Sequence, residues 1–250
     1  MNPFDLSGRV AAITGANTGI GQAIALALAA AGADVALIGR TPATDTADKA
    51  RALGRKAEIV SADLSTIAPV EGVVAQTLDA LGGLDILINN AGIIRRNDSL
   101  DFTEEDWDAV IDTNLKSVFF LCQAAGRHMV GQGRGKIVNI ASMLTFQGGV
   151  RVPSYTASKS GIGGLTKLLA NEWAAKGVNV NAIAPGYIAT NNTAALQADE
   201  TRNRQIVERI PAGRWGDSSD LGGAAVFLSS SASDYVNGHI LAVDGGWLAR

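Results

Sequence analysis

The stretch Thr14-Gly15-Ala16-Asn17-Thr18-Gly19-Ile20-Gly21 joins a short apolar run over 10–14 to an alanine- and leucine-rich segment over 21–31. This order predicts a buried strand, a tight turn and a helix. In such a turn the first glycine permits the reversal of the chain, the second lets the backbone approach a ligand closely, and the third lets the helix pack on the sheet. Because the N-terminus of a helix offers free N–H groups, the stretch favours a pyrophosphate-binding turn over a plain strand-to-helix connection.

The alternation of strand-like and helix-like segments continues along the chain. Apolar runs rich in Val, Ile and Ala recur at 10–14, 34–38, 57–61, 84–89, 136–140, 178–183 and 240–243, and helix-like segments include 21–31, 69–81, 104–131 and 154–175. Because the first six runs are almost continuously apolar, we expect parallel strands covered on both faces. The sequence therefore predicts an α/β fold, a single domain over 1–250 with a Rossmann-type doubly wound parallel sheet of seven strands and helices on both faces. The segment 187–218 lacks a clear period and is expected to form a substrate lid.

The composition excludes several classes of protein. The 250 residues carry a formal net charge of −3 without a block of Lys or Arg, so nucleic acid is not an expected partner. Cys122 is the single cysteine, which excludes a disulfide framework and a Cys/His metal cluster and fits a reducing compartment. No apolar run approaches the ~20 residues of a membrane span, and we expect no leader segment. The expectation is a cytoplasmic protein without a metal or a membrane anchor.

The end of the second apolar run bears on the choice of cofactor. An acidic residue at this point binds the ribose 2′-hydroxyl of NAD, but the sequence has Gly39-Arg40-Thr41. Arg40 can pair with a 2′-phosphate through its planar guanidinium, and Thr41 adds a hydroxyl. The chemistry leans to NADP and leaves NAD open, and an exposed loop arginine without a ligand is the alternative interpretation.

A tyrosine and a lysine on one helical segment are the candidate catalytic pair. Tyr155 and Lys159 are four residues apart, so both project from the same helix face. A phenol has a pKa of about 10, and a nearby ammonium lowers it toward the range of an efficient base. Ser142 follows the run 136–140, where its hydroxyl can hold a substrate oxygen as charge develops on it. The three residues together predict proton transfer to or from the oxygen of a hydroxyl or carbonyl group.

From about Phe4 onward the sequence resembles the short-chain dehydrogenases/reductases. The resemblance rests on motifs in the order and spacing of that family, namely Thr14 to Gly21, Asp63-Leu64, Asn89-Asn90-Ala91-Gly92, Asn114, Ser142, Tyr155 with Lys159, and Pro185-Gly186 through Thr190. It implies that Asp63 with Leu64 meets the adenine, that Asn90, Ala91 and Gly92 line the dinucleotide, and that Pro185, Gly186, Ile188 and Thr190 bind it near the nicotinamide carboxamide. It also implies that Lys159 grips the nicotinamide ribose and that Asn114 supports a water relaying protons from Lys159.

Longer runs resemble a branch of that family that acts on sugar acids such as 2-deoxy-D-gluconate, 2-dehydro-3-deoxy-D-gluconate or gluconate. These runs are 139–144, 151–160, 179–187, 189–193, 209–216 and 243–250. The resemblance implies oxidation of a secondary hydroxyl, and members of this branch usually use NAD, which leaves the cofactor open. Candidate substrate residues are Arg95, Arg96 and Arg151 for the carboxylate, Asn191 and Asn192 for hydroxyls, and Met143 and Gln147 along the pocket.

Two other functions remain open at this point. A 3-oxoacyl-carrier-protein reductase shares all the motifs and needs a basic docking patch, for which Arg95, Arg96 and Arg127 are candidates. A dinucleotide-binding protein without catalysis is the second alternative, and the intact catalytic residues speak against it. The resemblance implies a homotetramer built through 104–131 and 154–175. Trp247 near the C-terminus is expected to be exposed on the monomer and covered by a neighbouring subunit.

Overall fold

The computed structural model describes residues 2–250 and contains one seven-stranded parallel sheet in the order β3-β2-β1-β4-β5-β6-β7. The strands are β1 (Val10–Thr14), β2 (Asp34–Gly39), β3 (Ala57–Ser61), β4 (Ile86–Asn89), β5 (Gly135–Ile140), β6 (Val178–Pro185) and β7 (Ile240–Val243). The chain builds one half of the sheet outward from β1 and then returns to build the other half from β4. The predicted doubly wound sheet is confirmed, and the strand order reverses between β1 and β4.

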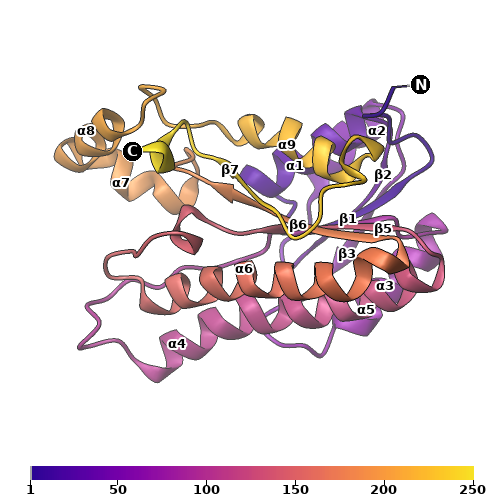
Figure 1. Cartoon of the computed structure of the whole chain (residues 1–250), viewed down its shortest axis with the longest axis horizontal. Helices are drawn as coiled ribbons and strands as arrows, with labels where there is room; N and C mark the ends of the chain where they lie inside the picture. Colours follow the sequence, from indigo (N-terminus) through magenta and orange to yellow (C-terminus); the bar gives the residue numbers. More distant parts are fainter. Residues whose placement is uncertain (1) are drawn as a thin grey trace.

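Helices cover both faces of the sheet (Figure 1). The α-helices are α1 (Gly19–Ala30), α2 (Thr44–Ala52), α3 (Val70–Leu81), α4 (Glu104–Ile111), α5 (Ser117–Gly131), α6 (Pro153–Trp173), α7 (Ala194–Ala198), α8 (Glu200–Arg209) and α9 (Gly222–Ser229). One apolar core lies between the sheet and α3, α5 and α6, and a second lies between the sheet and α1, α2 and α9. Within residues 2–250 no helix combines the length and the apolar character needed to cross a bilayer.

The burial of each strand depends on its position in the sheet. All residues of β1 and β6 are buried, as expected for strands covered on both faces. The prediction of a continuous buried run is wrong for β3, which forms an edge of the sheet and exposes Glu58 and Ser61. β4 begins at Ile86 rather than at 84.

The predicted single helix over 104–131 is wrong at its centre. Asp112–Lys116 forms a π-helical turn between α4 and α5. Within this turn the Asn114 side chain accepts a hydrogen bond from the Ile93 N–H at 2.8 Å and donates to the Ile93 carbonyl at 2.8 Å. π-helical turns inside α-helices occur frequently at functional sites, and this one places a buried amide beside the loop that follows β4.

The segment 187–218 is mainly helical. It contains a 3₁₀ turn, Asn191–Thr193, followed by α7 and α8. Its two ends lie side by side, because Ile188 and Gly216 form a bridge and the Ala189 N–H donates to the Gly216 carbonyl at 2.8 Å. The segment therefore leaves the sheet and returns to the same point, as a compact excursion does.

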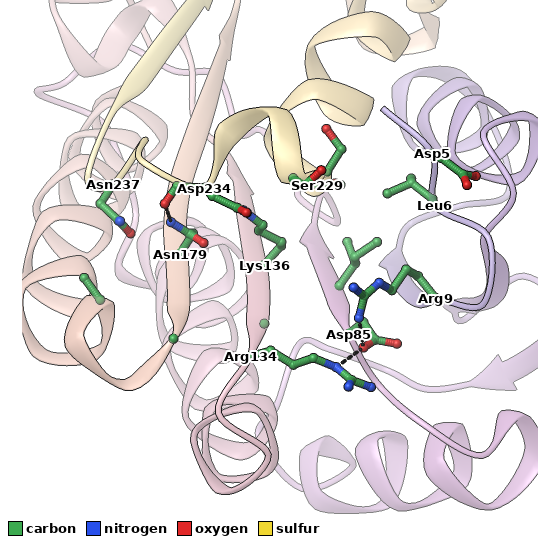
Figure 2. A pocket seen from close by; sticks show the side chains of 16 residues that line it. Asp5, Leu6, Arg9, Asp85, Arg134, Lys136, Asn179, Ser229, Asp234 and Asn237 are labelled. Carbon is green, nitrogen blue, oxygen red and sulfur yellow. Dashed lines mark hydrogen bonds and ion pairs between the residues drawn. The ribbon is translucent and has the colours of Figure 1, made fainter. Parts of the chain in front are cut away.

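At the amino ends of the strands, ion pairs connect neighbouring strands (Figure 2). The Asp85 carboxylate accepts hydrogen bonds from Arg9 Nη1 at 3.2 Å, Arg134 Nε at 2.9 Å and the Val10 N–H at 3.0 Å. Lys136 Nζ donates to Asp234 at 2.7 Å. The crossover helices end near the amino ends of the strands. The negative ends of their dipoles stabilise the arginine and lysine side chains there.

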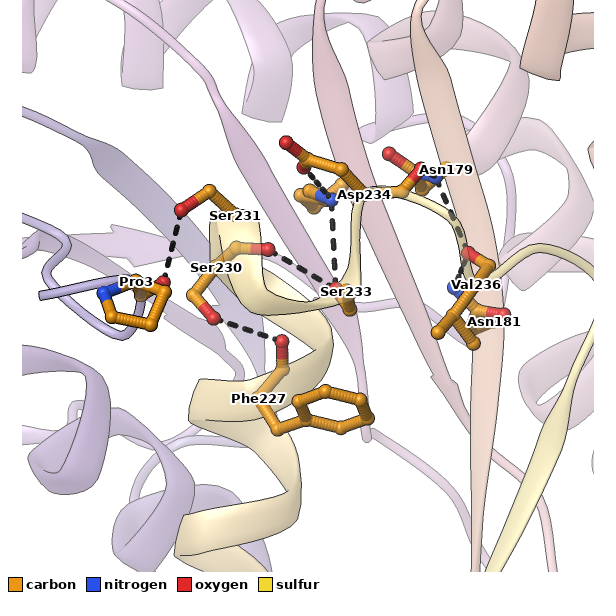
Figure 3. Close-up of polar contacts among 10 residues, drawn as sticks. Pro3, Asn179, Asn181, Phe227, Ser230, Ser231, Ser233, Asp234 and Val236 are labelled. Carbon is orange, nitrogen blue, oxygen red and sulfur yellow. Dashed lines mark hydrogen bonds and ion pairs between the residues drawn. The ribbon is translucent and has the colours of Figure 1, made fainter.

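Side-chain amides and hydroxyls fix the segment that leads into β7 (Figure 3). Asn181 Nδ2 donates to the Val236 carbonyl at 2.8 Å, and Asn179 Nδ2 donates to the Asp234 carbonyl at 3.0 Å. Ser231 Oγ donates to the Pro3 carbonyl at 3.0 Å, which joins this segment to the N-terminal residues. The start of β7 is thereby anchored to β6.

Candidate active site

Two cavities lie at opposite ends of the strands. One lies at the amino ends, has a volume of about 410 Å³ and is lined by the ion pairs of Asp85 and Lys136 described above. The other, about 670 Å³, lies at the carboxyl ends of the strands. In open α/β sheets ligands bind at that end, where the strand order reverses. The second cavity, called the cleft below, is lined by Gly15, Asn17, Thr18, Gly19, Ile20, Gly21, Asn90, Ala91, Gly92, Ile93, Ile140, Ala141, Ser142, Tyr155, Lys159, Pro185, Gly186, Ile188, Ala189, Thr190, Asn191, Asn192 and Thr193.

The glycine turn forms one end of the cleft. Gly15 and Gly19 have φ of 67° and 58°, the left-handed region that favours glycine. A Cβ at Gly21 would collide with the Gly15 carbonyl and with the Asn90 amide. The Thr18 side chain makes no capping hydrogen bond to α1, so the N–H groups of the first turn of α1 face the cleft without a side-chain cap. The turn therefore has the space, backbone donors and dipole that a phosphate needs.

Asn90 connects the turn to the loop after β4. Its Nδ2 donates to the carbonyls of Thr14 at 2.9 Å and Gly15 at 3.2 Å. Thr14 Oγ1 in turn accepts from the N–H groups of Asn90 at 3.0 Å and Ala91 at 2.9 Å. Asn90 and Ala91 line the cleft as expected, but the Asn90 amide group holds the turn in shape.

The residues predicted at the adenosine end lie outside the cleft lining. Arg40 and Thr41 are exposed after β2, and Arg40 Nε lies 4.0 Å from the Asp63 carboxylate, with side chains 68% and 54% exposed. Hydrogen bonds from Ser65 lower the pKa of Asp63, and the charge of Arg40 adds to this effect. Leu64 is buried in the core. Arg40 thus has a weak partner and a free guanidinium face.

The three candidate catalytic side chains line the cleft together. Ser142 lies just beyond β5 and accepts a hydrogen bond from the Leu144 N–H at 3.1 Å. Tyr155 and Lys159 lie one turn apart on α6, with the ammonium 5.6 Å from the centre of the phenol ring. The Lys159 ammonium donates to the Ile140 carbonyl at 2.6 Å. The end of β5 therefore positions both Ser142 and Lys159.

The electrostatics of this group differ from the prediction. Burial raises the pKa of Tyr155, while a hydrogen bond with Ser142 and the charge of Arg96 act in the opposite direction. Burial lowers the pKa of Lys159 to about 8. The predicted lowering of the Tyr155 pKa by Lys159 is therefore not seen in this structure, because desolvation dominates and the cation whose charge opposes it is Arg96.

The predicted substrate residues fall into two groups. Asn191 and Asn192 line the cleft, whereas the other candidates do not. Arg96 Nη2 donates to the Asn192 carbonyl at 3.3 Å, so it lies beside the cleft wall. Arg95 pairs with Asp106 at 3.1 Å and Arg151 pairs with Asp98 at 3.1 Å. These two arginines already have carboxylate partners within the chain.

Met143, Gln147 and Trp247 form a packed cluster next to the cleft. Met143 is buried against Trp247 and Ile206, and Gln147 Oε1 accepts from Trp247 Nε1 at 3.2 Å. The prediction that Trp247 is exposed on the monomer is wrong, since it is 5% exposed and is covered by the 187–218 segment of its own chain. Met143 is therefore a packing residue beside the cleft and does not line it.

Several residues of the site were not found by sequence reasoning. Ile93 and Ile140 contribute backbone carbonyls, which no side-chain pattern reveals. Thr193 Oγ1 accepts from the Thr190 N–H at 3.0 Å and donates to the Ile188 carbonyl at 2.8 Å, which fixes the loop after β6. The spacing of Thr190 and Thr193 ahead of α7 was the available signal, because threonine hydroxyls cap such turns.

Comparisons with known proteins agree with this geometry. Residues 15–248 match the family model described as enoyl-(acyl carrier protein) reductase. The chain is 58% identical, over 100% of its length and 99% of the relative, to a 2-dehydro-3-deoxy-D-gluconate 5-dehydrogenase of Escherichia coli. A crystal structure from Agrobacterium tumefaciens, described as a 2-deoxy-D-gluconate 3-dehydrogenase with bound NADP, is 60% identical, with a TM-score of 0.95 and full coverage of both chains. Another from Beutenbergia cavernae, described as an NAD(P)-dependent gluconate 5-dehydrogenase with bound NADP, is 49% identical, with a TM-score of 0.96 and 100% coverage of both chains.

Proposed function

Since the chain belongs to the short-chain dehydrogenase/reductase family, we propose that it is an NAD(P)-dependent dehydrogenase. It moves a hydride between the dinucleotide and a secondary hydroxyl or ketone of a small sugar acid. The observation that carries this function is the convergence of Ser142, Tyr155 and Lys159 on the cleft that begins at the glycine turn. The turn binds the pyrophosphate and the three side chains act at the reacting carbon.

The cleft fits a dinucleotide. The cleft joins the phosphate-binding turn to the catalytic residues, and the Gly21 position leaves no room for a side chain between turn and helix. A Cβ at Gly19 would lie 3.6 Å from Thr190, so the turn lies against the loop after β6. A Cβ at Gly92 would lie 3.2 Å from Asn114 Oδ1, so a glycine here lets the cleft lining lie close against Asn114. Pro185, Gly186, Ile188 and Thr190 hold the nicotinamide end. The bound dinucleotide accepts or supplies the hydride.

The chain's own residues handle the proton and the developing charge. In oxidation Tyr155 takes the proton of the substrate hydroxyl while the carbon loses its hydride and the carbonyl forms. Ser142 donates a hydrogen bond to the same oxygen and holds it in place. With a pKa of about 8, Lys159 is mainly protonated at neutral pH, and its ammonium grips the ribose. The charge that favours the phenolate comes from Arg96.

Asn114 has a positioning role that its contacts support directly. Both polar atoms of its side chain are bonded to the backbone of Ile93, which lines the cleft. It thereby fixes the loop between β4 and α4 against α5. Support of a proton-relaying water near Lys159 stays a prediction.

NADP is the proposed preferred cofactor. Arg40 is exposed after β2 and held only by a 4.0 Å contact with Asp63, so its guanidinium can turn to a 2′-phosphate at small cost. Two structurally similar proteins were crystallised with NADP. The Asp63 carboxylate accepts a hydrogen bond from the Ser65 N–H at 3.0 Å and lies 4.0 Å from Arg40. Its contact with the adenine stays a prediction.

A sugar acid is the proposed substrate. The wall that contains Asn191 and Asn192 offers side-chain amides to sugar hydroxyls. Arg96 is the cation whose charge reaches Tyr155, and it borders Asn192, so we assign the substrate carboxylate to it. Arg151 and Arg95 are less suited, because each already pairs with an aspartate.

The rival function, reduction of 3-oxoacyl groups on a carrier protein, is less well supported. It needs free cations for an acidic partner, but Arg95 pairs with Asp106 and Arg127 pairs with Glu71 at 2.7 Å. Of the three candidates for a docking patch, Arg96 alone has no carboxylate partner among the ion pairs of residues 2–250. A single arginine gives weak recognition of a carrier protein.

The proposed assembly is a homotetramer acting in the cytoplasm. Trp107 on α4 and Leu168 on α6 are 41% and 46% exposed, and Phe119 and Phe120 on α5 are only partly buried. These helices lie along one face of the sheet and provide an apolar surface for a second copy (Figure 1). Light scattering at micromolar concentration tests the assembly, and a monomeric mass contradicts it.

A substrate panel tests the proposed reaction. The purified protein is assayed for reduction of NAD and NADP with 2-deoxy-D-gluconate and D-gluconate. In the reverse direction, oxidation of the reduced dinucleotide is followed with the ketone formed from 2-dehydro-3-deoxy-D-gluconate or with a 3-oxoacyl thioester. Turnover of a sugar acid, lost in Tyr155→Phe, supports the proposal. Turnover of the thioester alone supports the rival.

A further inference from the structure

The C-terminal residues 244–250, called the clip below, lie beside α7 and α8 (Figure 1). The Trp247 ring is enclosed by Tyr187, with ring centres 4.8 Å apart, and by the Arg209 guanidinium, 3.9 Å from its ring centre. Arg209 is the last residue of α8, and Tyr187 follows the cleft residue Gly186. The clip therefore contacts the 187–218 segment at both ends.

Arg250 completes the C-terminus of α8. Its Nη2 donates to the Glu208 carbonyl at 2.6 Å and its Nε donates to the Arg209 carbonyl at 3.1 Å. The last carbonyls of a helix have no partner within the helix, so these bonds satisfy groups that otherwise face solvent. The clip thus holds the end of α8 through backbone groups as well as through Trp247.

A tight turn seats the clip directly on the cleft wall. The Asp244 carboxylate accepts from the N–H groups of Gly246 and Leu248, each at 2.9 Å. Gly245 and Gly246 have φ of 65° and 89°. A Cβ at the cleft residue Gly186 would lie 2.6 Å from Asp244 Cα, so the turn and the wall touch without an intervening side chain.

Trp247 also contacts the opposite wall, which follows Ser142. Its indole N–H donates to Gln147 Oε1 at 3.2 Å, and Met143 packs in the same cluster. An indole nitrogen can only donate, so it fixes the orientation of the Gln147 amide. One side chain therefore links the turn after the catalytic serine to Tyr187, next to the cleft residue Gly186, and to the end of α8.

We infer that the clip sets the spacing between the turn after Ser142 and the loop after β6, with Trp247 as the positioning residue that determines affinity for the sugar acid. The inference rests on the proposed function and deepens it. Among residues 2–250, the glycine turn and Arg40 make no hydrogen bond or ion pair with the clip. The clip meets the nicotinamide end at Gly186 through Asp244, and the bond between Trp247 and Gln147 does not involve that contact. Loss of this bond therefore changes substrate binding and leaves dinucleotide binding unchanged.

Kinetics of Trp247→Phe and Gln147→Ala test the inference. Trp247→Phe keeps an aromatic ring but loses the N–H, and the sugar-acid KM rises about fivefold, the effect of losing one neutral hydrogen bond. The KM for NADP changes less than about twofold on the same argument. Because the two residues form one bond, the double variant shows no further rise. An unchanged sugar-acid KM, an equal rise for NADP, or additive effects overturn the inference.

A second measurement works without any substrate. Hydrogen exchange of the amides of α8 is compared in the wild type, Arg250→Ala and Arg209→Ala, with Arg204→Ala as the matched control. Arg204 lies on the same helix, is 71% exposed and makes only a 4.0 Å contact with Glu208. The inference predicts that exchange is at least about tenfold faster than in the wild type in Arg250→Ala and Arg209→Ala, and unchanged in Arg204→Ala. Equal exchange in all four proteins overturns it.

The two measurements separate this inference from the proposed function. If the wild type binds NADP but turns over no sugar acid, the proposed function fails. Faster exchange of α8 in Arg250→Ala still supports the clip in that case, and unchanged exchange still refutes it.

Discussion

Replacement of Arg40 by alanine tests the basis of cofactor choice. The Arg40 side chain is 68% exposed and its contact with Asp63, itself 54% exposed, is 4.0 Å long, so breaking that pair costs well under 1 kcal/mol by analogy with exposed pairs. A hydrogen bond to a charged phosphate contributes about 1.5–3 kcal/mol. We take about 2 kcal/mol for this exposed position, which corresponds to a roughly 30-fold rise in the KM for NADP.

The KM for NAD should change by less than about twofold, because NAD has no 2′-phosphate for the guanidinium to contact. Initial rates at saturating substrate give both constants. Lys49→Ala is the matched control, since it removes one positive charge from the neighbouring helix α2, where the lysine is 55% exposed and pairs with Asp45. An NADP KM within twofold of the wild type in Arg40→Ala refutes the argument, as does an equal rise in Lys49→Ala.

Three further predictions concern the site and the fold. Tyr155→Phe lowers kcat by about 10²–10⁴, the usual contribution of a positioned acid or base, and titration of dinucleotide fluorescence shows unchanged binding; a variant of normal kcat contradicts the assignment. The lowered pKa of Lys159, about 8, means that the folded chain binds this proton less tightly than the unfolded chain, so the cost of burying the charge is present below pH 8 and is relieved toward pH 10.5. The unfolding free energy of the wild type relative to Lys159→Met should therefore rise across that window by up to about 3 kcal/mol in urea titrations, and a flat or falling difference contradicts the shift. Asp85→Asn removes the shared partner of Arg9 and Arg134 and should lower the unfolding free energy by about 2 kcal/mol, a value discounted because both arginines are partly exposed. A loss below about 0.5 kcal/mol, the size of an ordinary surface change, argues against a stabilising role of this cluster.

The sheet was predictable because buried parallel strands leave a simple signal. The run over 10–14 and the glycines behind it fixed the first strand, the turn and α1 from local chemistry alone. The edge strand β3 departs from the pattern because one of its sides has no neighbour, which permits Glu58 to face solvent. α2 was missed because it is short and hydrophilic and buries only small residues, Thr46, Ala47 and Ala50.

The catalytic end of the site was predictable from spacing. Four residues along a helix bring Tyr155 and Lys159 to one face, whatever the rest of the fold does. Their electrostatics were not predictable, since burial raises the pKa of Tyr155 and lowers that of Lys159, and burial depends on the assembled fold. The sequence has no signal for the Ile140 carbonyl that receives the lysine.

The substrate side was the hardest part to predict. Arg151 and Arg95 are attractive carboxylate ligands by type, but the fold pairs each of them with an aspartate from a neighbouring loop or helix. Trp247 looks like an exposed tail residue because the α8 residues that cover it lie about 40 positions earlier in the chain. Such contacts between distant segments are set by tertiary packing and have no local signature.

Transfer of deuterium tests the central claim most directly. The purified protein is incubated with NADP and carbon-deuterated 2-deoxy-D-gluconate, and the reduced dinucleotide is analysed by mass spectrometry. The account predicts one deuterium in each reduced dinucleotide, formed at least about a hundredfold more slowly by Tyr155→Phe, which still binds NADP. Bound NADP without any deuterium transfer from this or another sugar acid would contradict a dehydrogenase of sugar acids.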